Sequence, residues 1–201
     1  MTAFPSLRRY TEAEYLAHEE RAEHRSEFYR GEIFAMSGGT VNHDRIAGNT
    51  YLALRIALDG RPCETFTSNM HVLVEKYRLY TYPDVSVACG GVIRVQDRND
   101  TITNPVLIIE VLSESTERHD RTDKFRFCRA IPSLREYVLI DQYSVRLEHH
   151  WKVDGERWIF EEITDLDSVV TLHAVEASLS VRDLYARVEF HTSHESLAGE
   201  F

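Results

Sequence analysis

The chain has 201 residues, of which 43% are hydrophobic, and its formal net charge is -10. This length predicts a single domain over residues 1–190, and the polar residues 191–201 predict a flexible tail. No apolar run approaches the roughly eighteen residues of a membrane span, and the N-terminus lacks a secretory pattern. We therefore expect a cytoplasmic protein without a membrane partner. The acidic charge argues against non-specific nucleic-acid binding, which depends on Lys and Arg neutralising phosphates.

Three cysteines stand far apart in the sequence, at Cys63, Cys89 and Cys128. An odd number at wide spacing fits neither a disulfide framework nor a CxxC metal knuckle. We therefore expect three free thiols in the core.

The N-terminal part of the chain predicts two helices separated by a hairpin. Residues 11–23 predict a short surface helix with Thr11 as its N-cap and Glu14 completing a capping box. Residues 26–37 predict a hairpin that turns at Arg30-Gly31. Apolar residues at helical spacing over 42–58 predict an amphipathic helix.

The remaining sequence predicts mostly strands. Strand patterns occupy 66–74, 82–89 and 106–112, followed by a helix over 116–130 and a strand over 136–140. A hairpin over 143–162 and a short helix over 180–188 follow. The order is helix, three strands, helix, strand, with additions at both ends, which is typical of an α/β fold.

Glu110 directly follows the continuous apolar run 106–109. Such a run predicts a strand that is covered on both faces in the middle of a sheet. A carboxylate in this position is expensive to desolvate unless a cation or hydrogen-bond donor accompanies it. Glu110 therefore either binds a cation or marks the solvated end of the strand.

Asp84 is the second unusual carboxylate, at the beginning of the strand 82–89. Alternation places it on the face opposite Val85 and the other core-facing residues of that strand. If this strand pairs antiparallel with 106–112 and Gly90 lies opposite Asn104, Asp84 lies opposite Glu110. Two facing carboxylates with Cβ atoms about 4.5 to 5.5 Å apart repel each other unless a cation lies between them. All-oxygen ligands favour Mg²⁺ or Mn²⁺ over zinc.

A lysine should complete this site beside the metal. We expect it to be Lys124, on the helix that follows Glu110. Asp120 and Lys124 are spaced i, i+4, which is equally typical of a surface ion pair. In the functional interpretation, the ammonium reaches back over the strand end, where it positions an attacking water or stabilises charge on a phosphate. The segment 117–129 is also locally basic, with five Lys or Arg against three acids, so it is either a nucleic-acid patch or a solvated face of mixed charge.

These residues resemble the Uma2 family, also called DUF820, which belongs to the PD-(D/E)XK nuclease superfamily. The similarity covers most of residues 10–165. Its sequence elements are specific when they occur together and in order, whereas each alone would be a weak match. They are YRGEI at 29–33, Asn42-His43, YPDVS at 82–86, PVLIIEVLSEST at 105–116, the D-x-x-x-K spacing from Asp120 to Lys124, and REYVLID at 135–141.

The resemblance implies a restriction-endonuclease-like αβββαβ core with a mixed central sheet flanked by helices. It also implies that Asp84, Glu110 and the backbone carbonyl of Val111 bind the metal. The superfamily usually carries its lysine two residues after the Glu, where this chain has Leu112. In Uma2-like members the lysine stands on the next helix, which matches Lys124.

Glu32 and His43 match recurrent family positions and are further candidates for the site. For His43 the alternative is a structural hydrogen bond at a helix N-terminus. The resemblance implies a metal-dependent endonuclease that hydrolyses phosphodiester bonds in nucleic acid, with DNA as the expected substrate. By analogy with nucleases that cut two strands, a homodimer is one expectation.

Two other classes of function stay open. The chain could be a non-catalytic module that keeps the nuclease fold for protein contacts, which the acidic net charge favours. It could also hydrolyse a small phosphate ester. Metal titration separates the first class from the enzymes, and a panel of polymeric and monomeric substrates separates the two enzymes.

Overall fold

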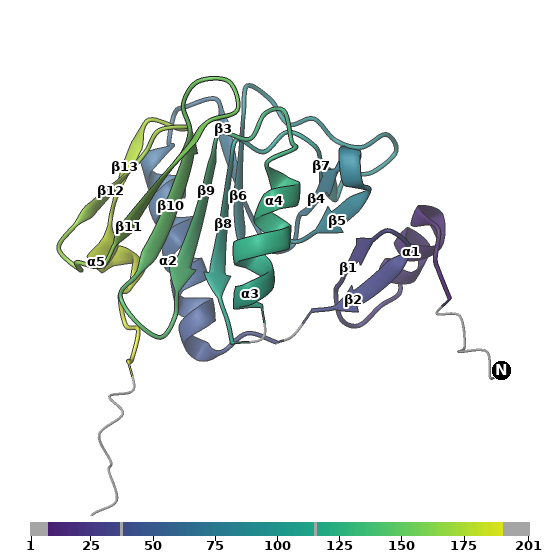
Figure 1. The fold of residues 1–201 in the computed structure, drawn as a ribbon, viewed down its shortest axis with the longest axis horizontal. Helices are drawn as coiled ribbons and strands as arrows, with labels where there is room; N and C mark the ends of the chain where they lie inside the picture. The colour runs from purple at the N-terminus through teal and green to yellow at the C-terminus, as the bar shows by residue number, and fades with distance from the viewer. Residues whose placement is uncertain (1–7, 37, 115, 191–201) are drawn as a thin grey trace, which may run out of the picture.

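The structure of the chain is a computed structural model that describes residues 8–36, 38–114 and 116–190. Its strands form a six-stranded, a five-stranded and a two-stranded sheet, with helices packed on the strands (Figure 1). The expected α/β class is therefore confirmed. In the described part of the chain, no helix is both long and apolar enough to cross a membrane. The expected tail, 191–201, lies outside the described residues.

The six-stranded sheet is mixed and has the order β11-β10-β9-β8-β6-β3. Its strands are β3 (Cys63–Thr67), β6 (Val85–Cys89), β8 (Leu107–Leu112), β9 (Glu136–Asp141), β10 (Leu147–Lys152) and β11 (Trp158–Ile163). The β8–β9 pair is parallel, and the other neighbours are antiparallel. Because α2 (Val41–Ala57) precedes β3 and a helical segment joins β8 to β9, the core has the predicted αβββαβ order.

Both faces of this sheet are covered, α2 lying on one and α4 (Phe125–Cys128) on the other (Figure 1). Ile46 and Leu54 of α2 are buried with Ile109 of β8 in one core cluster. Ile108 of β8 belongs to a second cluster with Phe127 of α4. Since side chains alternate along a strand, Glu110 falls on the α4 face, the side that faces the helical segment.

The helical segment between β8 and β9 is irregular. It consists of α3 (Glu117–His119), a π-helical turn (Asp120–Lys124) and α4, where the sequence predicts one helix over 116–130. A π-helical turn widens the helix, and such turns are frequent at functional sites. Asp120 and Lys124 are both buried in this turn, so their spacing is not that of a surface pair.

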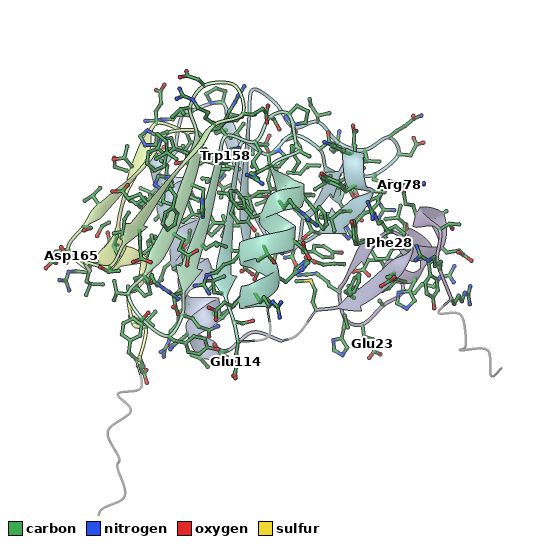
Figure 2. The ribbon with its side chains drawn as sticks, viewed as in Figure 1. Glu23, Phe28, Arg78, Glu114, Trp158 and Asp165 are labelled. Atoms are coloured by element: carbon green, nitrogen blue, oxygen red, sulfur yellow. A yellow bond between two sulfur atoms is a disulfide. The ribbon has the colours of Figure 1, made fainter. Side chains whose placement is uncertain are left out.

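The five-stranded sheet has the order β2-β1-β5-β4-β7. Its strands are β1 (Ser26–Tyr29), β2 (Glu32–Ala35), β4 (His71–Val74), β5 (Leu79–Thr81) and β7 (Thr101–Ile102). The predicted hairpin is β1–β2. Helix α1 (Glu12–Glu19), which begins with the predicted capping box, packs on it: Tyr15 stacks on Phe28, which Figure 2 labels. The helix ends at Glu19 rather than at residue 23.

The prediction of one strand over 66–74 is wrong. The segment is divided between β3 and β4, which belong to different sheets. A turn separates them, and Arg25 donates a hydrogen bond to the backbone carbonyl of Ser68 at 2.7 Å and a second to the side chain of Asn69. A 3₁₀ turn, Glu75–Tyr77, then leads from β4 to β5. Ser and Asn favour turns, which is the local reason that the strand stops.

The C-terminal part adds a two-stranded sheet that the sequence does not predict. Strands β12 (Val169–Leu172) and β13 (Ala177–Ser180) pair antiparallel, and the short helix α5 (Val181–Leu184) follows. Their buried residues join the same cluster as α2, so this hairpin extends the core on that side (Figure 1). The predicted helix over 180–188 is confirmed in its first turn only.

The expectation of three free thiols is wrong. Cys63 and Cys89 form a disulfide, while Cys128 is free and buried. The two bonded residues are direct partners in the antiparallel pairing of β3 with β6, with Cα atoms 4.0 Å apart. Their separation of 26 residues gave no local indication, because only the pairing of the two strands brings them together.

Candidate functional site

Asp84 lies one residue before β6 and is held against β8. In the observed register Val85 pairs with Ile109. Because the strands are antiparallel, extending this register by one residue places Asp84 opposite Glu110. The predicted register is therefore confirmed. The backbone N–H of Val111 donates a 2.7 Å hydrogen bond to Asp84 Oδ2, which fixes the carboxylate at the end of β8.

Glu110 is 3% exposed, on the face of β8 that α4 covers. Its Oε1 lies 2.9 Å from Lys124 Nζ, which is the distance of a charge-assisted contact between an ammonium and a carboxylate. Burial raises the pKa of Glu110 well above its ordinary value, and Lys124 opposes this rise. Glu110 is therefore a buried carboxylate whose nearest cation is Lys124.

Lys124 lies among three carboxylates. Its Nζ is 2.9 Å from Glu110, 3.1 Å from Glu27 and 3.9 Å from Asp120. Burial alone would lower the pKa of Lys124, but these carboxylates raise it well above its ordinary value. The side chain is therefore a buried ammonium ion directed at the end of β8, as the sequence predicts.

His43 comes from the first turn of α2 and meets Asp84 from the other side. Its Nε2 lies 3.3 Å from Asp84 Oδ2. Burial disfavours the protonated ring, but the contact with Asp84 outweighs it and raises the pKa of His43. The backbone N–H of His43 donates to Thr40 Oγ1, the side chain that caps α2. The backbone of His43 thus takes part in capping α2, while its ring contacts Asp84 in the site.

Two acidic residues of the cluster were not predicted as site residues. Glu27 of β1 accepts hydrogen bonds from Thr81 Oγ1 and from the backbone of Tyr82, in addition to its contact with Lys124. Burial would raise the pKa of Glu27, but Lys124 and these donors lower it. Asp120 is buried, and burial raises its pKa. The D-x-x-x-K spacing contained Asp120, whereas no local pattern indicated Glu27.

Glu32 is not brought to this cluster. It is exposed on β2, opposite Tyr29 at the end of the hairpin, and it is not among the residues that line the cavity described below. Glu27 is the acidic residue of the same hairpin that contacts Lys124. A role for Glu32 stays a prediction.

The cluster opens into a cavity of about 480 Å³. Asp84, Glu110 and Lys124 line it together with His43 and Val111. The hairpin β1–β2, the N-terminal end of α2, the end of β8 and the π-helical turn all contribute lining residues. Segments far apart in the sequence therefore converge on one concave site, which is the usual form of a ligand or substrate site.

The donors present fit a divalent metal with oxygen ligands. Within the described residues, no three His, Cys, Asp or Glu side chains are grouped so as to hold a metal ion. Mg²⁺ does not require such a group, because it commonly binds one or two carboxylates and keeps several waters. Asp84 and Glu110, with the carbonyl of Val111, match this pattern, and all three residues line the cavity.

The basic residues of 117–129 are mostly neutralised by nearby acids. Arg121 pairs with Glu117 and with Glu148, and Arg126 pairs with Asp123. Lys124 contacts Glu27, Glu110 and Asp120. In this part of the chain the structure favours a surface of mixed charge over a continuous basic patch.

Comparisons with known proteins show the family of the chain. Residues 12–184 match the family model Uma2, described as "Putative restriction endonuclease". Two uncharacterized proteins of Synechocystis sp. (strain PCC 6803) are similar: sll1609 is 40% identical over 153 residues, 76% of this chain and 86% of that protein. The second, slr1290, is 35% identical over 189 residues, 93% of this chain and 95% of that protein.

A solved structure shows the same fold. It is the crystal structure of "a putative nuclease belonging to DUF820" from Anabaena variabilis, with a TM-score of 0.71 and 20% sequence identity. The match covers 87% of this chain and 96% of the other. The nuclease-like fold expected from the resemblance is therefore confirmed, and since the family model spans most of the chain, this protein belongs to the Uma2 family.

Proposed function

We propose that this protein is a metal-dependent endonuclease that hydrolyses phosphodiester bonds in nucleic acid, with DNA as the expected substrate. The observation that carries the proposal is the convergence of Asp84, Glu110 and Lys124 on one cavity, although they come from three different segments of the chain. The proposal is supported by the family model, described as "Putative restriction endonuclease", and by a fold like that of the DUF820 structure. The acidic net charge does not oppose catalysis, because local geometry rather than overall charge places the reacting groups.

In this proposal Asp84, Glu110 and the backbone carbonyl of Val111 hold Mg²⁺ or Mn²⁺. Such an ion, when bound, polarises a phosphoryl oxygen and lowers the pKa of a bound water. The hydrogen bond from the Val111 N–H and the contact with His43 keep the Asp84 carboxylate in place. Glu110 must be ionised to bind the ion, and Lys124 favours that ionised form.

Lys124 acts as a hydrogen-bond donor and a positive charge. The surrounding carboxylates keep it protonated, so it orients the attacking water and stabilises charge on the phosphoryl group but does not accept a proton. Glu27 and Asp120 fix the ammonium from behind. In this arrangement Asp84 and Glu110 bind the metal, while Glu27 and Asp120 position Lys124.

The first prediction concerns the two metal-binding carboxylates. Asp84→Asn and Glu110→Gln remove one charge each at constant shape, and each should slow Mg²⁺-dependent cleavage of supercoiled plasmid, single-stranded DNA or RNA by about 100-fold or more. Calorimetric titration with Mg²⁺ should show weakened binding in both variants. Asp59→Asn, which changes an exposed carboxylate outside the cavity, should keep both properties.

Two results would decide against the proposal. Unchanged cleavage by the purified Asp84→Asn and Glu110→Gln variants would remove the assigned roles. Absence of metal binding and of cleavage in the wild type would instead favour the non-catalytic module. A preference for monomeric phosphate esters over polymers would indicate the small-molecule hydrolase.

A further inference from the structure

One wall of the cavity is apolar and does not belong to the charged cluster. Tyr29, Phe34, Met36, Leu79 and Phe127 line it. Phe34 is 48% exposed, although it lies in a strand of a paired hairpin. A large ring left this exposed gains little from folding, and an apolar surface inside a concave site is typical of ligand binding.

The hairpin holds this wall at a fixed place relative to the charged cluster. Phe34 of β2 is the direct cross-strand partner of Glu27 of β1, and directly opposed residues share one face with Cβ atoms about 4.5 to 5.5 Å apart. Glu27 contacts Lys124 at 3.1 Å. Phe34 is therefore the strand neighbour of Glu27, the carboxylate that contacts the Lys124 ammonium.

The rest of the wall is held rigidly by aromatic packing. Tyr29, two residues after Glu27, lies on the same side of β1, and its ring centroid is 4.7 Å from that of Phe127. Phe127 is itself buried against the six-stranded sheet. This ring contact links the hairpin to α4.

The charges of the cavity do not favour a polyanion by themselves. Five carboxylates line it, from Glu27, Asp84, Glu110, Asp120 and Asp123, against the single ammonium of Lys124. Phosphate neutralisation by Lys and Arg is the usual source of nucleic-acid affinity, and it is weak here. The apolar wall supplies a different source, because a nucleobase stacked on an aromatic ring contributes about 1 to 3 kcal/mol.

We propose that the cavity binds one unpaired nucleobase against Phe34, so that the substrate is single-stranded or locally opened nucleic acid and not continuous duplex. In a duplex each base face is covered by its neighbours, so only an unpaired or extruded base can enter a pocket. The cavity, at about 480 Å³, lies within the usual range for small-molecule sites. This inference rests on the proposed function, whose site it completes with a specificity surface.

The test measures base contact without requiring cleavage. A single-stranded oligonucleotide that carries one fluorescent adenine analogue is titrated with the protein in Ca²⁺ instead of Mg²⁺, and the same strand is titrated as a duplex. We expect fluorescence quenching for the single strand and little for the duplex. Phe34→Ala should weaken single-strand binding by about 10-fold, and Phe34→Trp should retain it, because it keeps an aromatic face.

Phe160 provides a matched control, since it is a phenylalanine of β11 that is 55% exposed and lies outside the cavity. Phe160→Ala should bind like the wild type. Equal binding of single strand and duplex, no effect of Phe34→Ala, or no binding to either would overturn the inference. The proposed function fails by a separate result, unchanged cleavage in Asp84→Asn, which the binding titration does not measure.

Discussion

The single residue on which the site depends most is Lys124, because it is the one ammonium among five carboxylates that line the cavity. Lys124→Met removes the charge and leaves Glu110 and Glu27 buried without their cation. Breaking a buried ion pair on one side is strongly destabilising, so the free energy of unfolding should fall by about 3 kcal/mol, and cleavage should be lost. Urea unfolding followed by circular dichroism measures the first effect.

Lys76→Met is the matched control for that experiment. Lys76 is exposed, and it lies over the ring of Tyr77 rather than in the cavity. Its replacement should change the unfolding free energy by less than about 1 kcal/mol. Similar losses for the two variants would show that Lys124 contributes no more than a surface lysine does.

At this scale the sequence identifies the residues whose environment is local. Asp84 and Glu110 could be paired because an antiparallel pairing with Gly90 opposite Asn104 gives the register that the two strands have. Glu27 could not be found in this way, because its contact with Lys124 joins the first hairpin to a helix far along the chain. Asp120 was ambiguous, since a spacing of i, i+4 is the same for an exposed pair and for a buried one.

At the scale of elements, the disulfide between β3 and β6 yields a second stability prediction. It closes a loop with a sequence separation of 26, for which loss of chain entropy in the unfolded state predicts a stabilisation of about 3.5 kcal/mol. A reductant should lower the unfolding free energy of the wild type by an amount of this order. A Cys63→Ala, Cys89→Ala double variant should not respond.

Thiol titration after unfolding provides an independent check. Without reductant the unfolded wild type should expose only the thiol of Cys128, and with reductant it should expose all three. Three reactive thiols in the oxidised protein would mean that Cys63 and Cys89 are not bonded. The stability effect would then have no physical basis.

Elements with strong local patterns were predicted well, and those that depend on distant packing were not. Helix α2 repeats apolar residues at helical spacing, and the strands β8 and β9 contain continuous apolar runs; the structure confirms all three. The hairpin β12–β13 was missed because its strands have only four residues each, and their buried residues pack in the cluster that contains α2. The division of 66–74 depends on a turn that Arg25 stabilises from another element.

For the molecule as a whole, the sequence does not predict how the two large sheets are arranged around the cavity. The five-stranded sheet is assembled from short strands, and β7 has two residues. Its order joins the N-terminal hairpin to β5 and β4, which the chain reaches only after α2 and β3. Such non-local pairings have no periodicity of their own, although they bring Glu27 and Phe34 to the site.

The N-terminal part of that assembly should make global stability depend on pH. His71 of β4 is 1% exposed, its Nε2 lies 2.9 Å from Tyr15 Oη, and its ring stacks on Tyr82. Burial lowers the pKa of His71 from 6.5 to about 4. Its Nδ1 has no hydrogen-bond partner among the described residues, so a second ring proton would be left without an acceptor there.

The sign follows from the two pKa values. Between pH 6.5 and about 4 the unfolded chain binds a proton that the folded chain does not, so His71 contributes full stability above pH 6.5 and loses it as the pH falls. The loss amounts to roughly 3 kcal/mol over that range. Urea unfolding at several pH values should therefore show a smaller decrease for His71→Gln than for the wild type. The exposed His24→Gln variant should keep the wild-type dependence, and a His71→Gln profile parallel to it would exclude this origin of the acid sensitivity.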